Sequence, residues 1–208
     1  MARQAISEIR RGELVDAALE LIHEQGLMNM SVSKVSARAG LATGMVHHYF
    51  ADKGALLEAT MRRLNKRITA QIVGRMRAAQ TPIERVHAFI DGNVSEDSFT
   101  AAHVAAWLEF WAQVPRHVQL QRIHDVVARR TRTNLAHALK QIIAPEHADY
   151  IAQALTIFVD GIWLRAAVDP QGVTPAEGRR LAYRFLEDSL AAAKPKTAKP
   201  NPTGRGAK

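Results

Sequence analysis

The sequence predicts an all-α protein, and three features of its 208 residues support that fold class. Apolar residues recur at the spacing of one helix face between Leu14 and Ile22. The Thr-Pro-x-Glu stretches at 81–84 and 174–177 are capping boxes with proline at the first helical position, which mark helix starts. No segment alternates between apolar and polar residues with a period of two, so we expect no sheet.

The N-terminal elements follow from helix-boundary residues. Gly26 lies where a left-handed residue would end the first helix. Ser31 is a suitable N-cap for a short second helix, and Gly40 permits a tight turn after it. Asp52 is expected to cap a further helix and to place Lys53 in its first turn, where backbone amides and an ammonium group together form an anion site.

A short helix is also predicted between Gly40 and Asp52, with two different faces. One face holds Ala42, Val46, Tyr49 and Phe50, and the other holds Thr43, Gly44, His47 and His48. Two short helices joined through a glycine, behind a longer amphipathic helix, form a helix-turn-helix. The polar face offers a hydroxyl, bare backbone and two imidazoles, with no carboxylate to repel a phosphate. The alternative is a helical hairpin with solvated histidines.

The charge distribution divides the chain into three predicted parts. Residues 1–67 carry ten basic and seven acidic side chains and form the expected DNA-binding domain. Residues 68–193 are electrically neutral and form the expected effector-binding and dimerisation domain, a helical bundle. Residues 194–208 hold five basic residues, no acid and no large apolar residue, so we expect a disordered basic tail. A basic end suits a polyanion such as nucleic acid, although a merely solvated tail is favoured over a DNA-binding arm.

Several absences limit the function classes. There is no cysteine, which fits a reducing cytosol. Neither a signal peptide nor an apolar run of about 20 residues is evident. We therefore expect a cytoplasmic protein that does not enter the membrane. No catalytic or phosphate-binding motif occurs, and the nine histidines show no convincing metal-ligand spacing. We therefore expect no enzymatic activity, no metal and no cofactor.

Residues 10–67 resemble the DNA-binding domain of the TetR family of bacterial repressors. The segments Ala39-Gly40-Leu41, Thr43-Gly44 and Tyr49-Phe50-x-x-Lys53 fall at the family's spacing. Two positions depart from it, because Ala42 replaces the usual Ser or Thr cap and His47 replaces a common Tyr. Together with the polar face of the short helix between Gly40 and Asp52, the resemblance implies a set of DNA contacts. These are Ser31, Thr43, Gly44, Met45, His47, His48, Tyr49 and Lys53.

Three further segments resemble one subgroup of that family, the choline-responsive (BetI-like) repressors of glycine-betaine synthesis. They are residues 54–62, 106–112 and 160–167. The resemblance implies a repressor that a small effector, choline, releases from its operator. The alternative is a TetR-type repressor of efflux or catabolic genes with a different effector. A non-specific architectural DNA binder is disfavoured, because DNA coating requires no large neutral domain.

An aromatic stripe marks the predicted effector site. Trp107, Phe110 and Trp111 share one helix face by their i, i+3, i+4 spacing. Aromatic faces with a carboxylate suit a quaternary ammonium ion, which has no N–H to donate. The candidate ligand-binding residues are Phe89, Asp91, Trp107, Phe110, Trp111, Asp160 and Trp163.

Two alternatives remain open for this site. The stripe is equally typical of plain core, and Asp160 can instead cap its helix or pair with Arg165. The sequence also does not choose among the acids Glu109, Asp91 and Asp160.

The last two helices, about 146–168 and 175–192, resemble the pair that dimerises in this family. We expect Ile151, Leu155, Ile162, Leu186 and Leu190 to supply the apolar faces of a homodimer that reads a palindromic double-stranded DNA operator. The alternative is that these faces pack only within the monomer.

Overall fold

The computed structural model describes residues 2–97, 99–169 and 171–193, and every regular element within those ranges is a helix. The predicted all-α fold is therefore confirmed, while the expected tail at 194–208 lies outside the described residues. In chain order the elements are α1 (Ala2–Gln25), η1 (Leu27–Asn29), α2 (Val32–Arg38), α3 (Thr43–Tyr49), α4 (Lys53–Ala78), α5 (Pro82–Asn93), α6 (Ala101–Gln113), η2 (Val114–Arg116), α7 (Val118–Leu139), α8 (Pro145–Val168) and α9 (Pro175–Ala192).

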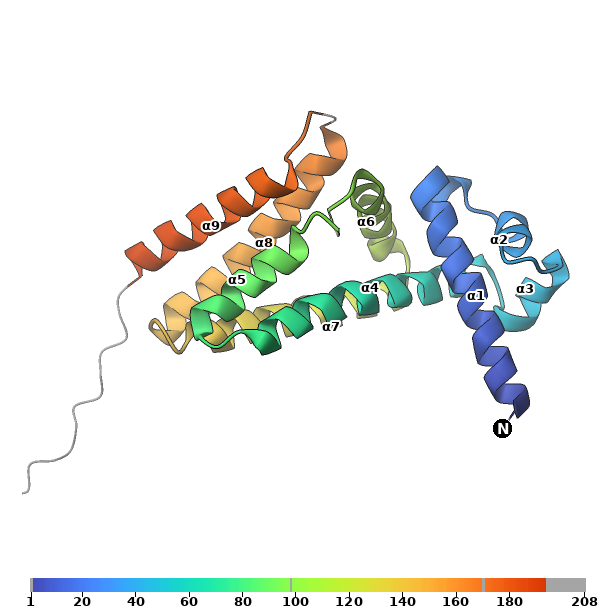
Figure 1. The fold of residues 1–208 in the computed structure, drawn as a ribbon, viewed down its shortest axis with the longest axis horizontal. Helices are drawn as coiled ribbons and strands as arrows, with labels where there is room; N and C mark the ends of the chain where they lie inside the picture. The colour runs from blue at the N-terminus through green and yellow to red at the C-terminus, as the bar shows by residue number, and fades with distance from the viewer. Residues whose placement is uncertain (1, 98, 170, 194–208) are drawn as a thin grey trace, which may run out of the picture.

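The helices form two groups joined by α4. Helices α1, α2 and α3 gather at one end of the molecule, and α5, α7, α8 and α9 form a bundle at the other (Figure 1). Helix α4 runs unbroken from the first group into the second, so the predicted boundary between residues 67 and 68 falls inside a helix.

Most predicted helix starts are found at the expected side chains. The Ser31 and Asp52 side chains accept hydrogen bonds from backbone amides three residues on, at 3.3 and 2.7 Å. Thr81 begins α5 with a complete capping box. At Thr174 only half of the predicted box forms: the hydroxyl accepts from the Glu177 amide, while the Glu177 carboxylate pairs with Arg180.

Two hydrophobic cores fill the molecule, and α6 takes part in both. The first core packs α1 to α4 together with parts of α6 and of the start of α7. The second core packs α5 and α7 to α9 with Val104 of α6. Trp107 and Trp111 are partly buried and pack against both cores, and Leu120 and Ile123 of α7 also belong to the first core, so α6 and α7 both link the two parts.

Helix α8 is apolar on more than one face. Its length and mean hydropathy would allow it to cross a membrane, contrary to the sequence expectation, but it packs against α6, α7 and α9 in the bundle. Ile151, Leu155 and Ile162 are buried inside the protomer, as is Leu186 of α9. Four of the five residues predicted to form a dimer face are thus core residues. The exposed apolar side chains of α8 are Tyr150, Ile157, Leu164 and Val168.

Glycine is required where α1 ends. Gly26 has φ of 80° and ψ of 159°, a conformation essentially restricted to glycine, and an added Cβ would lie 2.8 Å from Oε1 of Glu109 in α6. Gly40, with φ of 66°, makes the turn between α2 and α3. The turn at Gly40 agrees with the sequence prediction, whereas Gly26 has the predicted positive φ but not the ψ of a left-handed helical residue.

Replacing Gly26 with alanine is expected to lower the free energy of unfolding by about 1–3 kcal/mol, because alanine is strained there. Gly12→Ala is the matched control, since Gly12 lies in α1 with nothing within 4 Å of an added Cβ. That change should raise stability by up to about 1 kcal/mol through helix propensity. Denaturant titration measures both, and equal effects at the two glycines would contradict the conformational argument.

Candidate functional site

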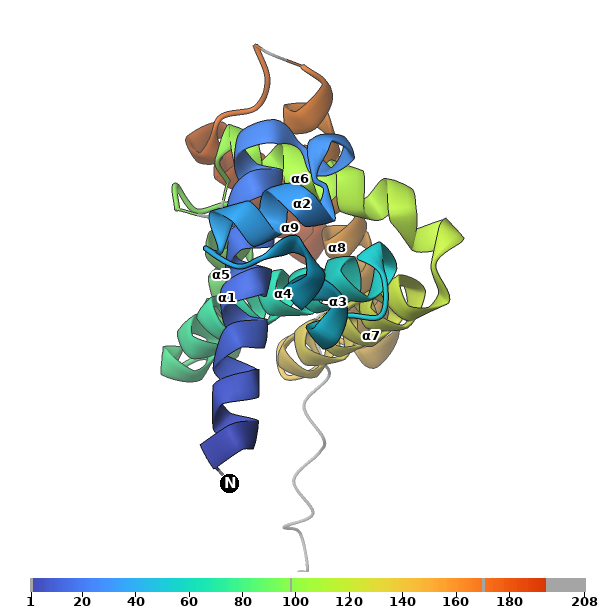
Figure 2. The same ribbon diagram turned by 90° about the vertical axis from the view of Figure 1, so that its right-hand side faces the viewer.

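The surface formed by α3 carries the residues predicted to contact DNA. Thr43, Gly44, Met45, His47 and His48 are exposed in the group of helices that faces the viewer in Figure 2. Buried Val46 and Phe50 anchor the opposite face of the helix. Ala42, predicted to face inward, is exposed and makes no side-chain cap.

Polar contacts hold α2 and α3 in place. Arg38 of α2 pairs with Glu24 and Glu20 of α1, at 2.6 and 3.3 Å. The hydrogen bond from Arg38 lowers the pKa of Glu24. Buried Ser36 lies 3.3 Å from the Thr43 hydroxyl, which ties the start of α3 to α2. The position of the exposed face of α3 is therefore set by its contacts with α2 and, through α2, with α1.

The remaining predicted DNA contacts lie at the end of α3 and at the starts of α2 and α4. Ser31 is partly buried, and its side chain caps α2. Tyr49 is also partly buried, with its ring 5.1 Å from that of His48 in an edge contact. Lys53 is exposed in the first turn of α4 and forms no ion pair with any residue that the structure describes. Lys53 is therefore available to an external anion.

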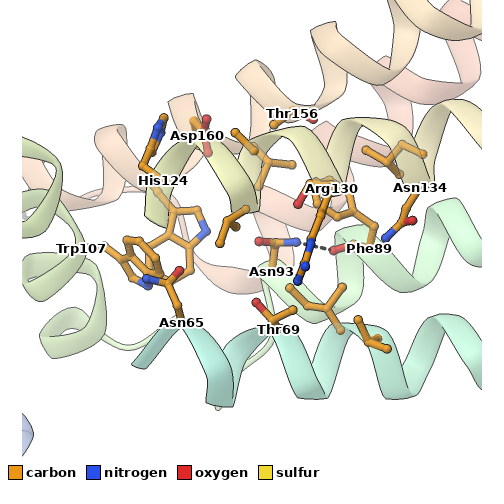
Figure 3. A pocket seen from close by; sticks show the side chains of 18 of the residues that line it. Asn65, Thr69, Phe89, Asn93, Trp107, His124, Arg130, Asn134, Thr156 and Asp160 are labelled. Atoms are coloured by element: carbon orange, nitrogen blue, oxygen red, sulfur yellow. Dashed lines mark hydrogen bonds between the residues drawn. The ribbon is translucent and has the colours of Figure 1, made fainter. Parts of the chain in front are cut away.

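A cavity of about 150 Å³ lies among α4, α5, α6, α7 and α8 (Figure 3). Engineered apolar cavities of about this volume hold a molecule of the size of benzene. Six of the seven predicted ligand-binding residues line it, from α5, α6 and α8: Phe89, Trp107, Phe110, Trp111, Asp160 and Trp163.

Three tryptophans form one wall of this cavity. The Trp107 ring centre lies 6.0 Å from that of Trp111 and 6.2 Å from that of Trp163, which comes from α8. Phe110 meets Trp107 edge-on at 5.2 Å. Helix spacing predicted only the α6 members of this group, whereas tertiary packing adds Trp163.

The structure separates the three candidate acids. Only Asp160 lines the cavity. Asp91 does not line it as predicted, because its carboxylate accepts a 2.7 Å hydrogen bond from the Tyr183 hydroxyl of α9. The carboxylate of Glu109 points to α1 and accepts a hydrogen bond from the backbone amide of Leu27. Asp160 forms no ion pair with Arg165 in the described part of the chain.

Asp160 lies between the cavity and the outer surface. A hollow outside, lined by Ile157 and Leu164 among others, shares Asp160, Trp111 and His124 with the cavity. The residue is therefore open to solvent on one side, while its carboxyl group is desolvated by its surroundings. Desolvation raises the pKa of Asp160 to about 6, against a smaller opposite effect of His124. An unpaired, partly desolvated carboxylate is a suitable partner for a cation.

Sequence reasoning missed the polar lining of the cavity. These side chains come from α4, α5, α7 and α8, and no local pattern connects them: Asn65, Thr69, Asn93, His124, Arg130, Thr131, Asn134 and Thr156. No group of three or more metal-ligating side chains occurs within the described ranges. The cavity therefore combines an aromatic wall with hydrogen-bonding groups, and it is open to an organic ligand.

Helix α6 connects the cavity to the group formed by α1, α2 and α3. Trp107 and Trp111 face the cavity, while Glu109 between them in sequence holds the Leu27 amide at the end of α1. The rings of His103 in α6 and His23 in α1 also meet, with centres 5.7 Å apart. Helix α6 therefore contacts both the cavity and the junction of α1 and η1.

The chain matches two family models. Residues 14–60 match bacterial regulatory proteins of the tetR family, and residues 82–191 match the C-terminal part of BetI-type transcriptional repressors. It is 35% identical over 197 residues to the HTH-type transcriptional regulator BetI of Cronobacter sakazakii, covering 94% of this chain and 98% of that protein. Identity to BetI of Escherichia coli K12 is 33% over 192 residues, covering 91% and 98% of the two chains.

Solved structures share the fold. A putative transcriptional regulator from Pseudomonas aeruginosa PAO1 has a TM-score of 0.75 at 26% identity, covering 89% of this chain and 92% of that one. A putative regulator from Saccharomonospora viridis, solved in complex with choline, has a TM-score of 0.75 at 19% identity, covering 87% and 96%. From these matches and the fold, the chain belongs to the TetR family, as a BetI-type DNA-binding transcriptional repressor and not an enzyme.

Proposed function

We propose that this protein works in the cytoplasm as a choline-responsive repressor of genes for glycine-betaine synthesis. The observation that carries the proposal is the cavity that brings Trp107, Trp111 and Trp163 together with the carboxylate of Asp160. The names of the BetI relatives and the choline complex of a protein with the same fold support it.

The aromatic wall suits a trimethylammonium group. Such a group cannot donate an N–H hydrogen bond, so it is held by ring faces and by a counter-charge. Each ring contributes about 0.5–2 kcal/mol of cation–π attraction, depending on how completely the site is desolvated. Asp160 supplies the counter-charge, and nearby Asn and Thr side chains are suited to hydrogen-bond the choline hydroxyl.

Helix α6 carries the effect of ligand binding to the DNA-binding helices, which releases the operator. A ligand that presses on Trp107 and Trp111 shifts α6, and Glu109 carries the shift to the Leu27 amide. The two recognition helices of a dimer must enter the major groove about 34–36 Å apart, or a multiple of that distance. A differential affinity of about 2 kcal/mol between the two states weakens operator binding about thirtyfold.

The exposed stripe on α8 is the proposed homodimer surface. Tyr150, Ile157 and Leu164 are seven residues apart and expose 72%, 62% and 48% of their surfaces. Heptad spacing keeps them on one face of the helix, and such exposed apolar stripes mark protein contacts. A two-fold dimer through α8 would match the two-fold symmetry of a palindromic operator.

Choline should bind the purified protein, and binding should release operator DNA. Trp107→Leu is expected to weaken choline binding about tenfold through the lost cation–π contact. Phe185→Leu is the control, because Phe185 stacks on Phe158 away from the cavity lining. Calorimetric titration measures the affinities and electrophoretic mobility shift the release. If choline neither binds nor releases DNA, the protein is instead a TetR-type repressor with another effector.

Choline binding should weaken as the pH falls through about 6, where Asp160 becomes protonated. The loss should reach up to about tenfold per pH unit below the pKa, because the cation selects the ionised form. Asp160→Asn should bind weakly with a flat profile, whereas Asp91→Asn should keep the wild-type profile. The raised pKa also means that ionised Asp160 lowers folding stability above about pH 6, so Asp160→Asn should stabilise the protein at pH 7.5 but not at pH 4.

The α3 surface should show separate phosphate and base contacts. Lys53→Ala should weaken binding to all DNA sequences and reduce the slope of log affinity against log salt by about 0.9, the value for one phosphate contact. Lys66→Ala is the control, since Lys66 is exposed on the same helix about 20 Å further along. His47→Ala should instead change the preferred operator sequence. An unchanged salt slope for Lys53→Ala would remove that residue from the DNA contacts.

A further inference from the structure

The cavity holds two opposite charges that are not paired with each other. Asp160 and Arg130 both line it, and neither forms an ion pair with any residue that the structure describes. His124 of α7 acts electrostatically on Asp160, so the two side chains lie at about the same position along the cavity. Arg130 follows His124 by six residues, a helix rise of about 9 Å. The negative and positive charges are therefore separated along the cavity.

The surroundings of the two charges differ. Trp107 and His124 lie at the end that holds Asp160 (Figure 3), and the rings of Trp111 and Trp163 lie next to Trp107. Arg130 extends across the middle of the cavity, among the polar side chains of Asn93, Thr69 and Asn134 (Figure 3). One end thus suits a quaternary ammonium group, and the other offers a guanidinium with amide and hydroxyl groups that suit a carboxylate.

We infer that the cavity takes a zwitterion whose quaternary ammonium group lies at the tryptophans and whose carboxylate pairs with Arg130. This rests on the proposed function, because it uses the same ammonium site. A simple cation meets the positive charge of Arg130 without compensating it. A zwitterion compensates both Asp160 and Arg130, and guanidinium binds carboxylate through two parallel hydrogen bonds.

The alternative is that Arg130 is only a solvated surface side chain, since it is exposed, as Arg129 is. The test is a calorimetric comparison of two ligands that differ only at one end. 4-(Trimethylammonio)butanoate has the trimethylammonium group and a carboxylate, and butyltrimethylammonium has the same chain length without the carboxylate. The wild-type protein should bind the zwitterion about tenfold more tightly, as expected for a charge-assisted pair.

Arg130→Gln should abolish this preference while leaving the affinity for butyltrimethylammonium unchanged or higher. Arg129→Gln is the matched control, because Arg129 is the neighbouring arginine, is exposed and does not line the cavity. It removes the same charge and should keep the preference. A preference that is absent in the wild type, or that survives Arg130→Gln, overturns the inference.

Measuring choline binding and release of operator DNA distinguishes a failure of this inference from a failure of the proposed function. If choline binds and releases DNA but the carboxylate adds nothing, only the zwitterion inference is wrong. If no trimethylammonium ligand binds, the proposed function and this inference both fail. Glycine betaine, with one carbon between its charges, should gain less from Arg130 than the butanoate, because its carboxylate extends less far from the tryptophans.

Discussion

Helix α6 has to satisfy two cores at once, and this constraint shapes the rest of the molecule. Phe110 is fully buried among the helices of the DNA-binding part, while Trp107 and Trp111 line the cavity of the bundle. Closely packed interiors do not deform continuously, so a ligand that displaces the tryptophans must also move Phe110 or Glu109. In the proposed function, the ligand and operator sites are coupled because they share this helix.

Local signals in the sequence predicted the fold almost completely. Ser31 and Asp52 act as caps and Gly26 ends α1, because these roles depend on backbone chemistry within a few residues. The exposed face of α3 was predictable for the same reason. Helix period also placed Trp107 and Trp111 on one face, but nothing local showed that Trp163 and Asp160 would meet them across the bundle.

The sequence predictions were wrong where tertiary packing determines which face of a helix is buried and which side chains line the cavity. Helix α8 is apolar on more than one face, so its sequence does not show that Leu155 faces the core and Ile157 faces outward. Asp91 and Asp160 both lie on apolar helices, and only the position of Tyr183 on α9 shows that Asp91 already has a partner. Arg130 follows another arginine in a charged helix and gives no local indication that it reaches a cavity.

The unbroken course of α4 has a mechanical consequence. Its 26 residues make a rod of about 39 Å that lines the cavity at one end and carries Lys53 at the other. Tilting such a rod by about 5° about its cavity end displaces the far end by about 3 Å, close to the rise of one base pair. In the proposed function, a small adjustment around a bound ligand would thereby be magnified at the DNA into a shift of about one step in register.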